Sequence, residues 1–97
     1  MLKLEKTIHT IPEETQELGA MVRAVRRNKG DEGIFCVMRS EATQGLMEIA
    51  PLAYARIEAK QHDISVFGLA KGKAHAIELV RLIVDKMAKN GDFRTGE

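Results

Sequence analysis

The order of apolar segments along the chain predicts a domain of the α/β or α+β class. Alternating or unbroken apolar residues are typical of strands, and apolar residues spaced by three and four are typical of helices. Strand patterns lie near residues 1–10, 34–38 and 62–69, and helical patterns lie near 13–27, 44–50 and 74–89. Pattern alone leaves open a parallel sheet or an antiparallel sheet with helices packed on one face.

The N-terminal segment has the pattern of a strand followed by a helix. Its apolar residues share one parity, which indicates one buried face, at Leu2, Leu4 and Ile8. Pro12 ends this strand, and Thr10 and Glu13 have the spacing of a capping box at a helix start. The helix then carries an apolar stripe at Leu18, Met21, Val22 and Val25.

The rest of the chain adds two strands and two helices. The apolar run from Ile34 to Met38 reads as a strand that needs cover on both faces. A short helix is expected over Gln44 to Ala50, because Pro51 inside a helix would cost about 3 kcal/mol. A strand over 62–69 and a long amphipathic helix over 74–89 follow.

Length and charge limit the classes of function. The 97 residues predict one domain over 1–91 with a polar tail over 92–97. Fifteen Lys and Arg against fourteen Asp and Glu give a net charge of +1, so no whole-chain field attracts a nucleic acid. Aromatic residues make up 4%, which argues against the stacking platforms of single-strand binders. Nucleic acid is therefore not the expected partner.

The single cysteine and the absence of long apolar runs bear on the compartment. Cys36 alone excludes an internal disulfide, which favours the reducing cytoplasm, and no signal peptide or membrane span is expected. Inside an apolar strand, Cys36 is more typical of a packed residue than of a thiol carrier. The three histidines do not have the spacing of metal ligands, so we expect no metal. Residues 68–73 depart from the sequence pattern of a phosphate-binding loop, so we expect no cofactor.

Several segments together resemble the HPr phosphocarrier family of the bacterial sugar phosphotransferase system. The segment Thr43–Leu52 is similar to that family's short middle helix, and the strand over 63–68 and the helix over 73–90 follow in the family's order. The resemblance implies an α+β open-faced sandwich, with a four-stranded, mainly antiparallel sheet and three helices on one face. The alternative is a small three-layer α/β or parallel-sheet domain.

The resemblance also implies phosphoryl relay through a histidine at the start of the first helix. His9 and Pro12 match the spacing of the family's His-x-Arg-Pro motif, with Ile11 in place of its arginine. His9 is then the nucleophile, and backbone N–H groups after Thr10 bind the phosphate. Matching segment lengths backward from Ile34 instead places Thr15 or Gln16 at the histidine position. On that alignment the relay site is lost.

Two function classes remain open. The first is a cytoplasmic phosphocarrier or protein-interaction module, whose docking surface the family places near Leu46 and Met47. Its partners are proteins, and the unbroken run at Ile34–Met38 adds the expectation of a homodimer. The second is a nucleic-acid-binding module that uses an edge formed by Arg23, Arg26 and Arg27. We expect no free-standing enzyme in either case.

Overall fold

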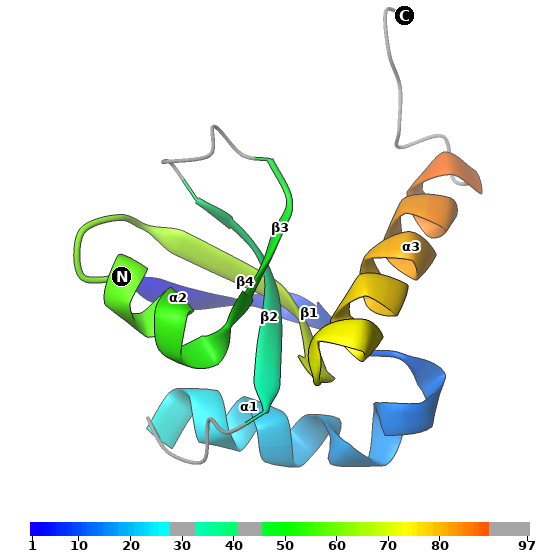
Figure 1. Ribbon diagram of the computed structural model, residues 1–97, viewed down its shortest axis with the longest axis horizontal. Helices are drawn as coiled ribbons and strands as arrows, with labels where there is room; N and C mark the ends of the chain where they lie inside the picture. Colours follow the sequence, from blue (N-terminus) through cyan, green and yellow to red (C-terminus); the bar gives the residue numbers. More distant parts are fainter. Residues whose placement is uncertain (28–32, 41–45, 90–97) are drawn as a thin grey trace, which may run out of the picture.

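A four-stranded mixed sheet lies at the centre of the protein (Figure 1). The computed structural model describes residues 1–27, 33–40 and 46–89. The strands are β1 (Leu2–His9), β2 (Ile34–Ser40), β3 (Glu48–Pro51) and β4 (Ile64–Lys71). The helices are the 3-10 helix η1 (Pro12–Glu17), α1 (Leu18–Arg27), α2 (Leu52–Glu58) and α3 (Lys73–Lys89). An α+β domain with four strands and three α-helices is confirmed.

The strand order is β1-β4-β2-β3, so β1 and β3 form the two edges. β2 pairs antiparallel with both β3 and β4, whereas β1 pairs parallel with β4. Because α2 returns the chain to the end of the sheet where β1 starts, Ile64 pairs with Leu2 and the two strands run the same way. The sheet is therefore mixed, and the expectation of a mainly antiparallel sheet is wrong.

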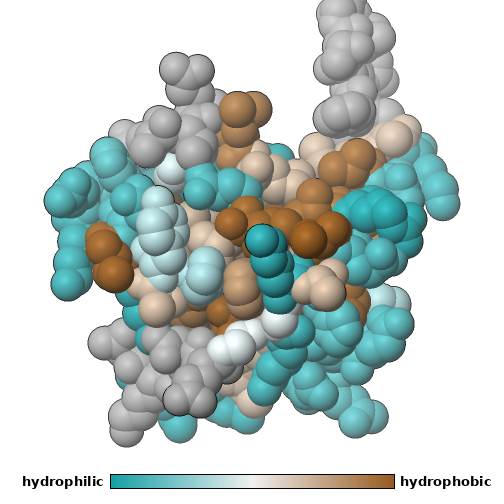
Figure 2. Space-filling model, in the orientation of Figure 1, coloured by the Kyte–Doolittle hydropathy of each residue, from teal (hydrophilic) through white to brown (hydrophobic). Residues whose placement is uncertain are grey.

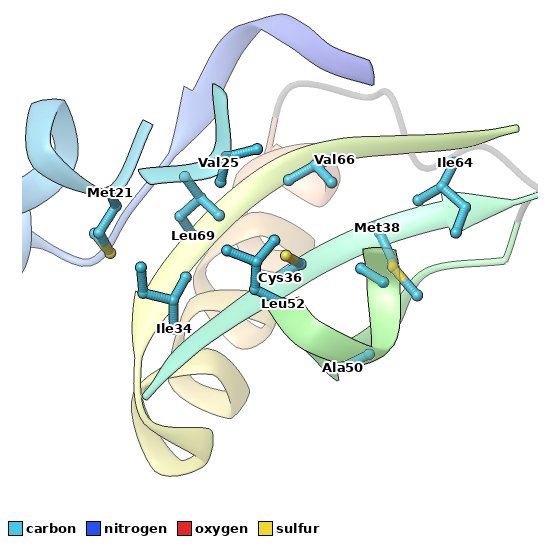
Figure 3. Close-up of a cluster of buried hydrophobic side chains, with 11 residues drawn as sticks. Met21, Val25, Ile34, Cys36, Met38, Ala50, Leu52, Ile64, Val66 and Leu69 are labelled. Atoms are coloured by element: carbon cyan, nitrogen blue, oxygen red, sulfur yellow. The ribbon is translucent and has the colours of Figure 1, made fainter. Parts of the chain in front are cut away.

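Helices cover both faces of the sheet. One buried cluster joins α1 and α2 to the sheet, with Cys36 fully buried in it (Figure 3). A second cluster joins α3 to the opposite face, where the next residue, Val37, is also fully buried. Neighbouring strand residues point to opposite faces, so β2 has helices on both sides. The expectation of three helices on one face is wrong, and the run at Ile34–Met38 needs no second copy to cover it.

A β-bulge in β4 adjusts the register of this core. Val37 pairs with Gly68 and Met38 pairs with Val66, so β4 carries one extra residue between its two partners. The bulge brings Leu69 to the same buried cluster as Val66 although their separation is odd. β4 therefore contributes apolar side chains to the α1 and α2 face along its whole length.

The middle of the chain differs from the expected helix. Residues 48–51 form β3, in which Glu48 pairs with Met38 and Pro51 pairs with Phe35. Residues 44 and 45 of the expected helix lie outside the described residues. The helix α2 begins after Pro51, which sits at the N-cap with φ −59°. A helix start needs no N–H from its first residues, so Pro51 opens the helix where we expected an interruption.

The other predicted elements are present with shifted bounds. The first strand, the strand near 62–69 and the long last helix are confirmed as β1, β4 and α3. The prediction of a capping box is wrong, because the N-cap residue of η1 is Ile11 and no side chain forms a capping hydrogen bond there. The predicted tail over 92–97 lies outside the described residues. Within the part of the chain that the structure describes, no helix is long and apolar enough to span a membrane.

Candidate functional site

His9, the predicted nucleophile, is the last residue of β1 and pairs with Gly68 of β4. Its ring is partly buried, and this burial, followed by the charge of Lys86, lowers the pKa of the imidazole. The 3-10 helix starts three residues later, at Pro12, and its Glu14 N–H already donates to the Ile11 carbonyl at 2.9 Å. His9 therefore presents a neutral imidazole near neutral pH, at the end of a strand and beside a lysine.

Thr10 was expected to start the anion-binding turn. Its Oγ1 is buried and has no hydrogen-bond partner among the described residues. The first turn after it carries Glu13 and Glu14, whose carboxylates oppose an anion. The surroundings of Thr10 therefore offer a phosphate little electrostatic stabilisation.

The predicted docking residues Leu46 and Met47 lie beside β3, at the opposite edge of the sheet from β1 and His9. Leu46 is 71% exposed, and Met47 packs at the margin of the α3 cluster. Figure 2 shows the apolar surface between β3 and α3 to which this margin belongs. The structure does not bring these two residues together with His9.

The arginines Arg23, Arg26 and Arg27 are all exposed on α1. Arg26 lines a groove with residues of β1 and α2, whereas Arg23 and Arg27 do not. Arg26 therefore also belongs to the lining of a groove between α1, α2 and β1, which the sequence did not predict.

One groove runs along β1 on the sheet face that α3 partly covers; we call it groove A. It has a volume of about 610 Å³ and is lined by Lys3, Leu4, Glu5, Lys6, Thr7, Arg39, Ser65 and Phe67. Because five consecutive residues of β1 line it, the groove follows this edge strand. The guanidinium of Arg39 lies 4.9 Å above the centroid of the Phe67 ring, which holds the cation over the sheet.

A second groove, groove B, lies on the other side of β1, against α1 and α2. It has a volume of about 560 Å³ and is lined by Leu2, Leu4, Val25, Arg26, Arg56, Ala59 and Lys60. Its floor is apolar and its charged residues are all cations. Arg56 donates from Nη2 to the Ala24 carbonyl at 2.9 Å, which links α2 to α1 at the groove wall.

The two grooves concentrate positive charge around β1. Among the described residues that line them, six are lysine or arginine and one, Glu5, is acidic. The whole chain carries a net charge of only +1, so the lining of the two grooves is far more basic than the total indicates. Fields from clustered charges raise the local concentration of an oppositely charged partner and its association rate.

A buried glutamate with a histidine partner marks another part of the molecule. Glu14 is 4% exposed, and both its carboxylate oxygens accept from the backbone N–H of Lys71, at 3.0 and 3.1 Å. Its Oε2 also lies 2.9 Å from Nδ1 of His75 in the first turn of α3. The hydrogen bond that the protonated His75 ring donates to the Glu14 carboxylate raises the pKa of His75. This contact fastens η1 to the junction of β4 and α3.

The thiol of Cys36 is buried in the core. Burial raises the pKa of the Cys36 thiol to about 12, so the thiolate needed for sulfur chemistry is scarce at neutral pH. Within the described ranges, no group of three or more His, Cys, Asp or Glu residues is arranged to hold a metal ion.

Sequence reasoning missed most of the basic residues in the grooves. Lys3, Lys6 and Arg39 come from β1 and β2, and Arg56 and Lys60 come from α2 and the residues after it. Each of these basic residues has an acidic residue within a few positions in the sequence, so no run of like charge identifies them. Only the packing of three distant segments around β1 and its neighbours places them along the two grooves.

Comparisons with protein-family models, with curated proteins and with solved structures found no match for this chain.

Proposed function

We propose that this protein is an interaction module that binds an acidic segment of a partner protein on grooves A and B. The observation that carries this proposal is the ratio of six cations to one carboxylate among the residues that line the two grooves. Apolar residues form the floor of groove B, so a partner gains from apolar burial as well as from charge. Binding of this kind is electrostatic at long range and weakens as salt is added.

Two of the cations are held in place before a partner arrives. Arg39 lies over the Phe67 ring, and Arg56 is bonded to the Ala24 carbonyl. Side chains that are ordered in advance lose less entropy on binding, which favours affinity. Arginine also binds carboxylates through two parallel hydrogen bonds, so glutamate and aspartate side chains fit these positions.

The test is fluorescence anisotropy with a labelled oligoglutamate peptide at low and at high salt. We expect binding that weakens steeply with salt, and Arg39→Glu should weaken it by about tenfold, equivalent to about 1.4 kcal/mol. The matched control is Lys89→Glu at the exposed end of α3, which changes the net charge equally but lies outside both grooves.

Three results would count against the proposal. An affinity that does not change with salt concentration, or an affinity that Arg39→Glu and Lys89→Glu lower equally, would show that the grooves are not the peptide-binding site. Tighter binding of a single-stranded oligonucleotide of equal charge would favour the nucleic-acid function instead.

A second proposal keeps phosphoryl relay through His9, as the HPr resemblance implies. It is supported by the lowered pKa of His9, which leaves its imidazole unprotonated and nucleophilic at neutral pH, and by the nearby charge of Lys86. Incubation with phosphoenolpyruvate and the general phosphotransferase enzyme should then give an acid-labile phosphate that His9→Ala abolishes. No labelling of the unaltered protein would reject the relay. In either role, we propose the cytoplasm as the site of action.

A further inference from the structure

We infer that the acidic partner binds as an extended strand that pairs with the outer edge of β1 and extends the sheet. This inference rests on the proposed function and specifies its geometry. It follows from the position of β1 at the edge of the sheet, with a basic groove on each of its two faces.

The backbone of β1 has groups directed to this edge. The Met1 carbonyl accepts from the Ile64 N–H at 2.9 Å, and Leu2, Lys3 and Leu4 pair in register with β4. In a parallel ladder, successive residues direct their N–H and C=O groups alternately to the two sides. Lys3 therefore bonds toward β4, while Leu2 and Leu4 direct their backbone groups to the open edge.

The charges explain why an added strand would be acidic. A strand at this edge lies about 4.8 Å from β1, and its side chains alternate between the two sheet faces. One set then lies beside groove A, near Lys3 and Lys6, and the other lies beside groove B, near Arg26 and Lys60. Because the grooves on both faces of the sheet are basic, acidic side chains at consecutive positions of the partner strand all lie near cations. A helix lying on one face would meet only one groove.

The same charges disfavour a second copy of this chain as the occupant. Lysine on an edge strand is a common protection against strand pairing between identical molecules. Pairing of β1 with another β1 would bring two sets of groove cations together, among them Lys3 and Lys6. The same cations repel a second copy of this chain and attract an acidic strand, so they contribute to specificity as well as to affinity.

The experiment compares two peptides of equal charge. One is the labelled oligoglutamate, and the other carries an N-methyl group on every backbone amide, which removes the N–H donors of an added strand in any register and keeps every carboxylate. We expect the methylated peptide to bind at least about tenfold more weakly than the parent. Hydrogen exchange of the Leu4 amide should also slow by at least about tenfold when the parent peptide is bound.

The outcomes separate the two proposals. Equal affinity of the two peptides, with salt dependence and the Arg39→Glu effect retained, would overturn strand addition and leave the binding function standing. Unchanged exchange at Leu4 with the parent bound would overturn it as well. Failure of every peptide to bind would reject the binding function and this inference together.

Discussion

Gly68 lies where the β-bulge of β4 passes under α3, and replacing it with alanine should destabilise the fold. A Cβ at this position would lie 3.0 Å from Cδ2 of Leu79 and 3.0 Å from Cβ of Val37. Ordinary carbon contacts are about 3.5–4.0 Å, so both are overlaps. The end of Leu79 can rotate away, but Cβ of Val37 moves only with the backbone of β2.

The size of the effect follows from two opposing terms. Overpacking of a buried site costs about 1–3 kcal/mol. Alanine in place of glycine recovers about 0.4–1 kcal/mol by restricting the unfolded chain. The midpoints of these ranges, about 2 and about 0.7 kcal/mol, leave a net loss of about 1.3 kcal/mol. We therefore expect Gly68→Ala to lower the free energy of unfolding by about this amount and the melting temperature by about 5–10 °C.

Urea unfolding followed by circular dichroism measures this change, with Gly19→Ala as the matched control. Gly19 lies in α1, and its added Cβ would have Nη1 of Arg23 as its nearest neighbour, at 3.5 Å. Alanine there should stabilise the protein by about 0.5–1 kcal/mol, because glycine is the poorer helix former. A Gly68→Ala protein as stable as the unaltered one would refute the close approach of β4 to β2 and α3.

Three further predictions follow from buried or paired side chains. The hydrogen bond to Glu14 raises the pKa of His75, so the stabilising charge of His75 is fully present below about pH 6.5 and is lost as the pH rises through the raised pKa. His75→Gln should therefore destabilise the protein more at pH 6 than at pH 9, as measured by urea unfolding. Equal destabilisation at the two pH values would contradict this prediction. The buried Cys36 thiol, with a pKa of about 12, should react with a disulfide reagent at pH 8 only after urea unfolding, and rapid reaction of the native protein would revive the thiol-carrier reading. Leu52→Ala should lower the free energy of unfolding by about 2–5 kcal/mol, because the Leu52 side chain is 0% exposed. Ile57→Ala, at a side chain that is 62% exposed, should lower it by under about 0.5 kcal/mol. Similar losses in the two variants would show that α2 does not pack as described.

Much of the fold was predictable where one local pattern dominated. The long helix α3 and the strand β1 have clear periodicity, and both are present. The middle of the chain was not predictable, because Pro51 is compatible both with the interruption of one helix and with the start of another. Pairing of residues 48–51 with β2 decided between them, and that pairing depends on residues distant in sequence.

The candidate site was predictable to a smaller extent. Arg26 was identified from a local cluster of bases, and the structure places it in groove B. The other cations of the grooves stand beside acids in the sequence, so local charge patterns conceal them. His9 carried a motif, yet the structure places it at the end of a strand and away from Leu46 and Met47.

The sequence by itself determined an alternation of strands and helices of the α/β or α+β class, an apolar setting for Cys36 and a nearly balanced charge, because composition and periodicity are local properties. Only the tertiary structure decided that β1 runs parallel to β4 at the sheet edge and that helices cover both faces. It also decided that Lys3, Arg39 and Lys60 flank the same strand. Strand direction and charge grouping depend on packing between distant segments, which no local pattern records.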